Sequence, residues 1–313
     1  MKDSLPKPNR SGYVLWPGDP GSDDRQLVGG KAAALAELVR LGVAVPPAFI
    51  VTTQAYADVG FPRNQVDWPD RLAAEIASAL AILREHAPHC RLIVRSSAPF
   101  EDSAEFSAAG QLESHISPVD LASVLDTIWR CWSSLARPEQ SGYAYPGGAQ
   151  DRTRMAVIVQ ELIETEVAGV LFTQGMESPG TAPMIVIEAG WGLSYGVTSG
   201  TIVPDRYFLD HETGQVLEIS LFPGVPLRTV LTAEGETQSV EAPDLAGRPT
   251  LDEQQLRELV AVARQIEGCY GAAQDIEWGF RDGQLTIFQA RPVTVAPRSP
   301  HGDVYTTEGE GGE

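Results

Sequence analysis

The sequence has only three cysteines. Cys90, Cys131 and Cys269 are odd in number and far apart, so neither a disulfide framework nor a zinc-binding spacing follows from them. Uninterrupted apolar runs long enough to cross a bilayer are also missing, and Met1 to Arg10 is polar rather than a signal region. We therefore expect a cytoplasmic protein in a reducing compartment, without a membrane partner.

Basic residues are scarce relative to acidic ones. The chain holds 23 Lys and Arg against 42 Asp and Glu, which gives a formal net charge of −19. This balance argues against a nucleic-acid or anionic-membrane partner, and it means that any phosphate site must be a local basic pocket. With 313 residues and 43% hydrophobic content, the chain can bury a substantial core and hold two lobes.

The most informative stretch is Gln274 to Thr294, in which two apolar-rich runs flank Arg281-Asp282-Gly283 and predict a β-hairpin. Its register decides which side chains share a face. A two-residue loop at Asp282-Gly283 would put Glu277 and Gln289 on opposite faces. A three-residue loop over Arg281 to Gly283, with Gly283 left-handed as a bulge, puts them on the same face, and we favour this register.

The favoured register gives the hairpin one polar and one apolar face. Carboxylate and amide oxygens suit Mg²⁺, and a planar guanidinium suits phosphate. The alternative is a half-solvated hairpin with ordinary surface charges. The polar face would hold Asp275, Glu277, Gln289 and Arg291, and the apolar face Ile276, Trp278, Phe280 and Phe288.

A second candidate region is the glycine pair Gly29-Gly30 before an alanine-rich helix that ends at Gly42. Backbone N–H groups at such a helix start, with Lys31 beside them, are typical of a phosphate grip. The spacing is not that of a Walker A motif. The alternative is an ordinary helix start with a solvated lysine.

Two further segments point to a nucleotide. A short apolar strand delivers Arg95, and a loop rich in Ser, Ala and Gly follows it as far as Gly110. We interpret that loop as a mobile lid over phosphates, the alternative being a flexible surface loop with a structural arginine. Another buried strand, Met155 to Gln160, leads into Gln160–Ile163, where a nucleotide-binding lobe often has its hinge.

Three amphipathic helices supply the remaining core. One spans Asp70 to His86, and a second is capped by Ser117 and runs to about Leu135. The last long helix has Thr250 as its expected N-cap, with Glu253 completing a capping box.

These stretches resemble, in order, the ATP-binding domain of the phosphoenolpyruvate synthase and pyruvate phosphate dikinase family, to which rifampin phosphotransferase belongs. The resemblance covers roughly Leu27 to Thr294. The matching motifs are G-G-K-A-A-A-L from Gly29, I-V-R-S-S-A from Ile93, S-A-A-G-Q from Ser107, A-G-V-L-F-T from Ala168, the segment Glu188 to Asp205 ending in V-P-D, and D-I-E-W-G-F with Q-A-R-P-V-T.

The resemblance implies an α+β ATP-grasp fold, in which two lobes clasp ATP and Mg²⁺. The expected division is an N-terminal lobe over 1–153, a C-terminal lobe over 154–295 and a disordered acidic tail over 296–313. In the implied site, the catalytic cations on the phosphates would be Lys31, Arg95 and Arg291, and Gly110 and its loop would cover the phosphates. The adenine would be faced by Gln160, Glu161, Leu162 and Ile163. Mg²⁺ would be held by Glu277 and Gln289.

The resemblance leaves three functions open. Family enzymes usually also carry a phosphohistidine domain and an acceptor domain, which we do not recognise here. We favour a dikinase-type component that converts Mg-ATP to AMP and phosphate and passes a phosphoryl group to a small-molecule acceptor through a histidine on a separate protein. The alternatives are a stand-alone ATP-grasp kinase or ligase that forms ADP, and a degenerate ATP-sensing module.

Overall fold

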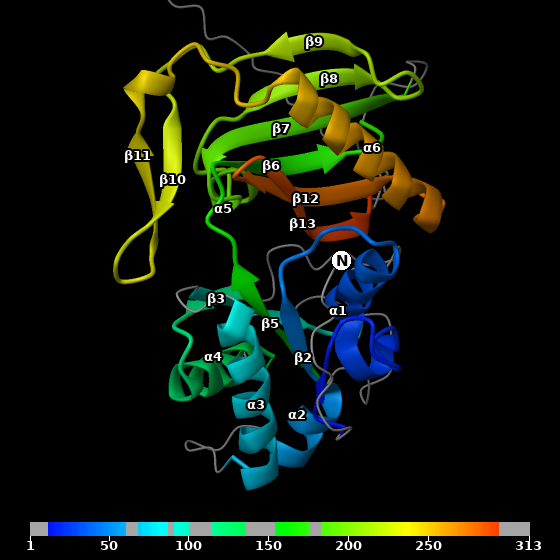
Figure 1. Ribbon diagram of the computed structural model, residues 1–313, viewed down its shortest axis with the longest axis vertical. Coiled ribbons are helices and arrows are strands. Elements are labelled where there is room, and N and C mark those ends of the chain that lie inside the picture. The colour runs from blue at the N-terminus through cyan, green and yellow to red at the C-terminus, as the bar shows by residue number, and fades with distance from the viewer. Residues whose placement is uncertain are drawn as a thin grey trace, which may run out of the picture.

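The computed structural model describes residues 12–60, 68–86, 91–99, 114–135, 154–175 and 183–293, which form two lobes (Figure 1). Within them, the first lobe holds a five-stranded sheet of order β1-β2-β5-β3-β4. The second holds an eight-stranded sheet, with β11-β10-β7-β6-β12-β13 as its main path; β8 pairs with β7, and β9 pairs with β8. The α+β class and the two lobes agree with the predicted ATP-grasp fold.

Most of the helices lie in the first half of the chain and most of the strands in the second half. In chain order they are β1 (Val14–Leu15), α1 (Arg25–Arg40), β2 (Ala48–Val51), α2 (Thr53–Val59), α3 (Asp70–His86), β3 (Arg91–Ser97), β4 (Ser114–Ser117), α4 (Leu121–Ser134), β5 (Ala156–Leu162), β6 (Val167–Phe172), β7 (Met184–Gly192), α5 (Tyr195–Thr198), β8 (Asp205–Asp210), β9 (Val216–Ser220), β10 (Leu227–Leu231), β11 (Thr237–Glu241), the 3-10 helix η3 (Pro243–Leu245), α6 (Glu253–Tyr270), β12 (Gln274–Arg281) and β13 (Gln284–Pro292).

Alternation along β3 orients Arg95 in the first lobe. Leu92 and Val94 are fully buried in the core that includes residues of α3 and α4. Ile93 and Arg95 lie on the opposite face of the strand, as the two-residue period of a strand requires. The predicted strand that delivers Arg95 is therefore confirmed.

Helix α1 differs from the expected form. It begins already at Arg25 and consists of two helical segments that meet at Gly29, whose φ of 77° is non-helical, so the second segment starts at the glycine pair as expected. A Cβ at Gly29 would lie 2.0 Å from the Ser97 carbonyl oxygen, so only glycine fits there. The amides of Gly30 and Ala32 donate to Ala98 O and Ser97 Oγ at 2.9 and 3.0 Å. Both amides are thus used within the protein, so neither is free to bind phosphate in this structure.

The second lobe packs α6 against one face of its sheet, as Figure 1 shows. Ile276, Trp278 and Phe280 of β12 are buried there, as predicted for the apolar face of the hairpin. Opposite them, α6 contributes its own apolar stripe, which is the set expected from the sequence. Its members are Leu256, Leu259, Val260, Ala263 and Ile266.

Two predicted helix caps are wrong. Helix α6 is capped by Asp252, which forms a capping box with Gln255, while Thr250 instead contacts the Tyr207 hydroxyl at 3.0 Å. Helix α4 is capped by Asp120, whose carboxylate accepts from the Ser123 amide at 2.9 Å, and Ser117 ends the strand before it. In both cases an aspartate closer to the helix takes the cap, because its oxygen reaches the amide three residues on.

The lobes do not divide where the sequence suggested. Strand β5, expected to open the second lobe, pairs with β2 and β3 in the first sheet. The change of sheet therefore falls between Leu162 and Val167, not between residues 153 and 154, and we propose the lobe boundary there.

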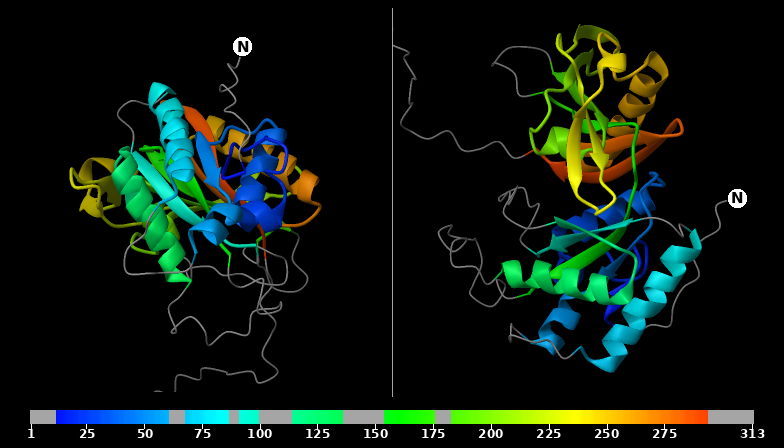
Figure 2. Two further views of the ribbon diagram at one scale, coloured as in Figure 1. Left: turned by 90° about the horizontal axis from the view of Figure 1, so that it is seen from below. Right: turned by 90° about the vertical axis from the view of Figure 1, so that its left-hand side faces the viewer.

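The β10–β11 hairpin also connects the two lobes. It extends to the first lobe (Figure 2), where the Arg91 guanidinium donates to Ala233 O.

Some predictions fall outside the described residues. They include Gly110, the loop from Phe100 that leads to it, and the acidic segment 296–313. Within the described part of the chain, no helix is both long and apolar enough to cross a membrane.

Candidate functional site

A cavity of about 580 Å³ lies between the two lobes. Its walls come from both sheets, from Lys31 on α1 and from α5. Ten residues were predicted from the sequence to form the site. Nine of them line this cavity, and the tenth, Gly110, lies outside the described residues. The nine are Lys31, Arg95, Gln160, Glu161, Leu162, Ile163, Glu277, Gln289 and Arg291.

The hairpin presents its polar face to this cavity, but the register arises differently from the prediction. Arg281 pairs with Gln284, so the turn holds only Asp282 and Gly283, both with positive φ (51° and 71°). The extra residue lies instead in β13, where the pairing shifts between Glu277 and Trp278 on the partner strand.

The bulge moves one predicted core residue into the cavity. Glu277 pairs with Gln289 and Trp278 with Ile287, which leaves Phe288 as the unpaired residue. Phe288 lines the cavity, while Ile287 is buried in the core of the second lobe. The prediction of Phe288 on the apolar face is therefore wrong, and the pairing of Glu277 with Gln289 is as expected.

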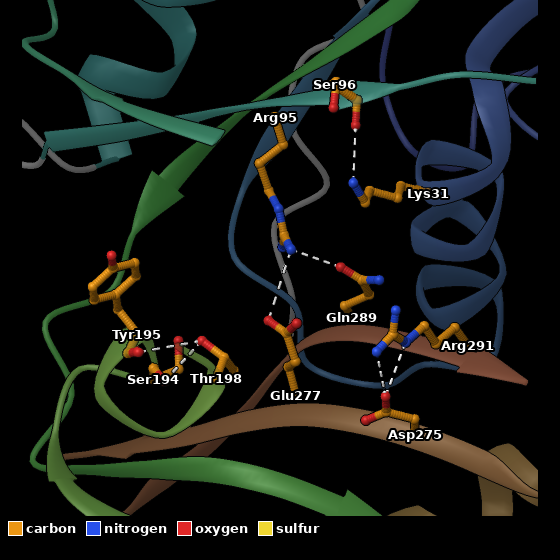
Figure 3. A network of polar contacts seen from close by, with 10 residues as sticks. All are labelled: Lys31, Arg95, Ser96, Ser194, Tyr195, Thr198, Asp275, Glu277, Gln289 and Arg291. Carbon is orange, nitrogen blue, oxygen red and sulfur yellow. Dashed lines mark hydrogen bonds and ion pairs between the residues drawn. The ribbon is translucent and has the colours of Figure 1, made fainter. Parts of the chain in front are cut away.

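Arg95 connects the two lobes at this point (Figure 3). Its Nη2 donates to Gln289 Oε1 at 2.6 Å and lies 3.7 Å from Glu277 Oε2. The Arg95 and Glu277 side chains are 13% and 24% exposed, so the contact is largely shielded from bulk water. A cation from the first lobe thus sits against the two side chains predicted to hold a metal.

Arg291 is held in place by its cross-strand neighbour Asp275. Its Nε and Nη2 both donate to Asp275 Oδ2, at 2.9 and 2.7 Å. The two residues are directly opposite each other in the β12–β13 ladder. This charged pair fixes the direction of the guanidinium, as the dashed lines in Figure 3 show.

Lys31 approaches the cavity from the first lobe. Its Nζ lies 3.5 Å from Ser96 O, at the outer limit of a hydrogen bond. Lys31 and Arg95 therefore belong to one wall, and the carboxylates of Asp275 and Glu277 to the other.

The predicted hinge lines the cavity where the chain passes from the first sheet to the second. Gln160 is only 2% exposed, and its Nε2 has no hydrogen-bond partner among the described residues. The Glu161 amide donates to Pro47 O at 2.9 Å. Leu162 and Ile163 add apolar surface to the lining. A buried amide donor beside apolar side chains is suited to a flat heterocycle with hydrogen-bond acceptors.

The sequence reasoning missed part of the lining. Glu188 faces the cavity and is paired with Arg206, Nε to Oε1 at 2.9 Å. Short helix α5 brings Ser194, Thr198 and the 52% exposed Tyr195 to the same space. The available signal was the glycine-rich run around α5.

Gly196 explains why that run is rich in glycine. A Cβ at Gly196 would lie 2.1 Å from Thr229 Oγ1. Only a residue without a side chain therefore lets α5 approach the neighbouring strand β10 so closely.

The oxygen donors on the hairpin fit Mg²⁺ better than a transition metal. Among the described residues, no group of three or more His, Cys, Asp or Glu is placed to hold a metal ion. Mg²⁺ does not need such a cage, because it is usually held by one or two protein oxygens together with substrate phosphates and water. Glu277 and Gln289, paired across the strands and facing the cavity, supply such a set.

The sequence profile of the family described as "Pyruvate phosphate dikinase, AMP/ATP-binding domain" matches residues 64–311. A probable phosphoenolpyruvate synthase from Methanothermobacter thermautotrophicus is 32% identical over 90% of this chain and 46% of its own length. The prodigiosin synthesizing transferase PigC from Serratia marcescens is 34% identical, over 86% of this chain and 32% of its own length. The rifampicin phosphotransferase from Streptomyces sviceus is 32% identical, over 90% and 36%.

The chain thus spans less than half the length of these curated relatives. Among solved structures, the D-alanine–D-alanine ligase from Bacillus anthracis overlaps 84% of this chain and 56% of its own, with a TM-score of 0.36 and 10% identity. That likeness is too weak to establish a common fold.

Proposed function

The chain belongs to the family of the pyruvate phosphate dikinase AMP/ATP-binding domain, and from that premise we propose that it binds Mg-ATP between its lobes and begins a phosphoryl transfer. One observation carries the proposal. Nine residues chosen from sequence motifs scattered between Lys31 and Arg291 line a single cavity. Residues so far apart in the chain converge there from both lobes.

In this proposal the phosphates lie between Lys31, Arg95 and Arg291. The three cations approach from both lobes, so they would bear on several oxygens of one triphosphate chain. Arg291, aligned by Asp275, presents a fixed guanidinium, and the ammonium of Lys31 acts as a point charge. Their work is positioning and charge stabilisation, which is the main contribution of a protein to phosphoryl transfer.

Glu277 and Gln289 would hold Mg²⁺ through their side-chain oxygens. When bound, the ion neutralises charge on the phosphate oxygens. The residues themselves orient the ion from a rigid hairpin whose other face is anchored in the core by Trp278 and Phe280.

The adenine would lie at the hinge. The Gln160 carboxamide supplies a donor that has no partner among the described residues, and Leu162 and Ile163 supply apolar contact. A hydrogen bond from this buried donor to an adenine ring nitrogen would give the donor a partner. Without a partner, a buried donor costs free energy because it has lost its hydrogen bonds to water.

We further propose dikinase chemistry, with a histidine on a separate protein as the first acceptor. Of the two phosphoryl groups beyond AMP, one passes through that histidine to a small molecule and the other goes to water as phosphate. Two observations support an external histidine: no histidine lines the cavity within the described residues, and His211 is engaged by Glu267 at 2.9 Å. The named functions of the longer relatives are compatible with this route.

Phosphorus NMR of the chain with Mg-ATP tests the reaction, and a thermal-shift titration tests binding. We expect Mg-ATP to raise the melting temperature, and AMP with phosphate to form slowly or only with a histidine-bearing partner. ADP formed with a small molecule alone would instead indicate a stand-alone kinase or ligase. The absence of any stabilisation by Mg-ATP would overturn the nucleotide site itself.

A further inference from the structure

We propose that, before nucleotide binds, the Arg95 guanidinium occupies the oxygen pair of Glu277 and Gln289 and keeps metal ions from binding there alone. The metal would then enter only with or after the nucleotide, whose phosphates draw Arg95 away. This inference rests on the proposed function of the same site. It adds an order of binding that the family membership does not supply.

The geometry of the contact is the first argument. Arg95 Nη2 is 2.6 Å from Gln289 Oε1, a short hydrogen bond that uses the oxygen a metal would need. The same nitrogen is 3.7 Å from Glu277 Oε2, within ion-pair distance. One guanidinium therefore bridges both predicted metal ligands, as Figure 3 shows.

Charge is the second argument. An arginine stays protonated at any ordinary pH, so it cannot make way for a metal by losing its proton. Two cations a few ångströms apart in a partly buried site repel strongly, because the effective dielectric constant there is well below that of water. A divalent ion can therefore bind at Glu277 only if Arg95 moves.

The third argument is that Arg95 has a better partner when nucleotide is present. Guanidinium pairs with phosphate through parallel hydrogen bonds, and its Nε is buried without a hydrogen-bond partner among the described residues. A phosphate would satisfy that Nε, which the Gln289 contact leaves unused. Because Arg95 is on β3 of the first lobe and its present partners are on the hairpin of the second, this exchange also releases a contact between the lobes.

The proposal predicts opposite effects of one substitution on two ligands. Arg95→Met removes the charge but keeps an apolar stem, so nucleotide should bind more weakly and metal alone more tightly. A residue that only gripped phosphate would weaken nucleotide binding and leave metal binding unchanged. The signs of the two effects therefore separate the proposal from a simple phosphate contact.

The test is a titration of nucleotide-free protein with Mn²⁺, followed by electron paramagnetic resonance. We expect Arg95→Met to bind Mn²⁺ about tenfold more tightly than wild type, from the loss of a nearby positive charge. Adding Glu277→Gln to Arg95→Met should remove the gain. Arg40→Met is the matched control, because Arg40 is an exposed residue at the end of α1, paired with Glu37, and its loss changes the net charge equally.

Equal Mn²⁺ affinity in wild type, Arg95→Met and Arg40→Met would overturn the proposal. If Arg95→Met does not fold, Arg95→Gln takes its place with the same expectation. The nucleotide measurement is separate, since wild-type protein that fails to bind Mg-ATP refutes the proposed function, whereas normal ATP binding with unchanged Mn²⁺ affinity refutes only the role of Arg95.

Discussion

Glu277 and Gln289 face each other across the β12–β13 hairpin although the turn between their strands holds only two residues. Counting from that turn alone would place them on opposite faces. The bulge at Phe288 restores the match, and it lies next to Gln289 itself, where it also turns an aromatic ring into the cavity. The two oxygen-bearing side chains therefore depend on a local irregularity of the strand rather than on the turn.

Replacing Glu277 should remove the proposed metal site without disturbing the fold. We expect Glu277→Ala and Glu277→Gln to lower ATP consumption by at least about 100-fold, since a preorganised charge aimed at the reacting groups is lost. The melting temperature should stay near that of wild type, because the core face of β12 is untouched. Glu258→Gln, on the exposed face of α6, is the control. Wild-type turnover in either Glu277 variant would refute the assignment.

Arg291 should have separable structural and functional roles. Arg291→Ala leaves the largely buried Asp275 carboxylate without its guanidinium, and we expect a loss of about 1–3 kcal/mol in the free energy of unfolding. Adding Asp275→Ala should recover much of that stability but none of the ATP consumption. Chemical denaturation and an activity assay on the double-mutant cycle measure both. Recovery of activity in the double variant would show that Arg291 has no direct contact with phosphate.

The two-residue period of strands explains part of the cavity lining, and the hairpin side chains were predicted from it. Leu92 and Val94 had to be buried, so Arg95 had to face the other way. The same reasoning placed Glu277 opposite the core face of Trp278. Where a residue pattern is periodic and one face is apolar, burial fixes the direction of the polar side chains.

The errors concern features that depend on tertiary contacts. The bulge at Phe288 is set by how β13 packs, and the kink at Gly29 by the close approach of Ser97, which lies 68 residues away along the chain. At α6, Thr250 contacts the Tyr207 hydroxyl instead of capping the helix. No local propensity encodes such contacts.

The cap of α4 should make stability depend on pH. The backbone hydrogen bond from Ser123 lowers the pKa of Asp120 below its usual 3.8. A lowered folded-state pKa means that the stabilisation is complete above pH 3.8 and is lost as the pH falls through the folded value. Asp120→Asn keeps an acceptor oxygen without a charge, so the difference in melting temperature between wild type and Asp120→Asn should shrink on acidification. A difference in melting temperature that stays constant from pH 7 to pH 3 would contradict this. Asp120→Ala, which removes the cap, should lower the free energy of unfolding by about 1 kcal/mol at neutral pH.

The position of Glu188 at the cavity wall should depend on the close approach of Gly169. Gly169 on β6 lies beside β7, and a Cβ there would be 1.8 Å from the Glu188 carbonyl oxygen, far inside contact distance. Gly169→Ala must therefore push β7 away. We expect a loss of about 2–3 kcal/mol and weaker nucleotide binding, because the Glu188 side chain lines the cavity.

Gly268 offers the matched control for this substitution. It lies exposed in α6, and a Cβ there would meet nothing within 4 Å. Gly268→Ala should raise the free energy of unfolding by about 0.5–1 kcal/mol, since alanine is the better helix former. Denaturant melts and ATP titrations of both variants give the comparison. If Gly169→Ala matched wild type in stability and in ATP affinity, the close approach of β6 to β7 would not determine the position of Glu188.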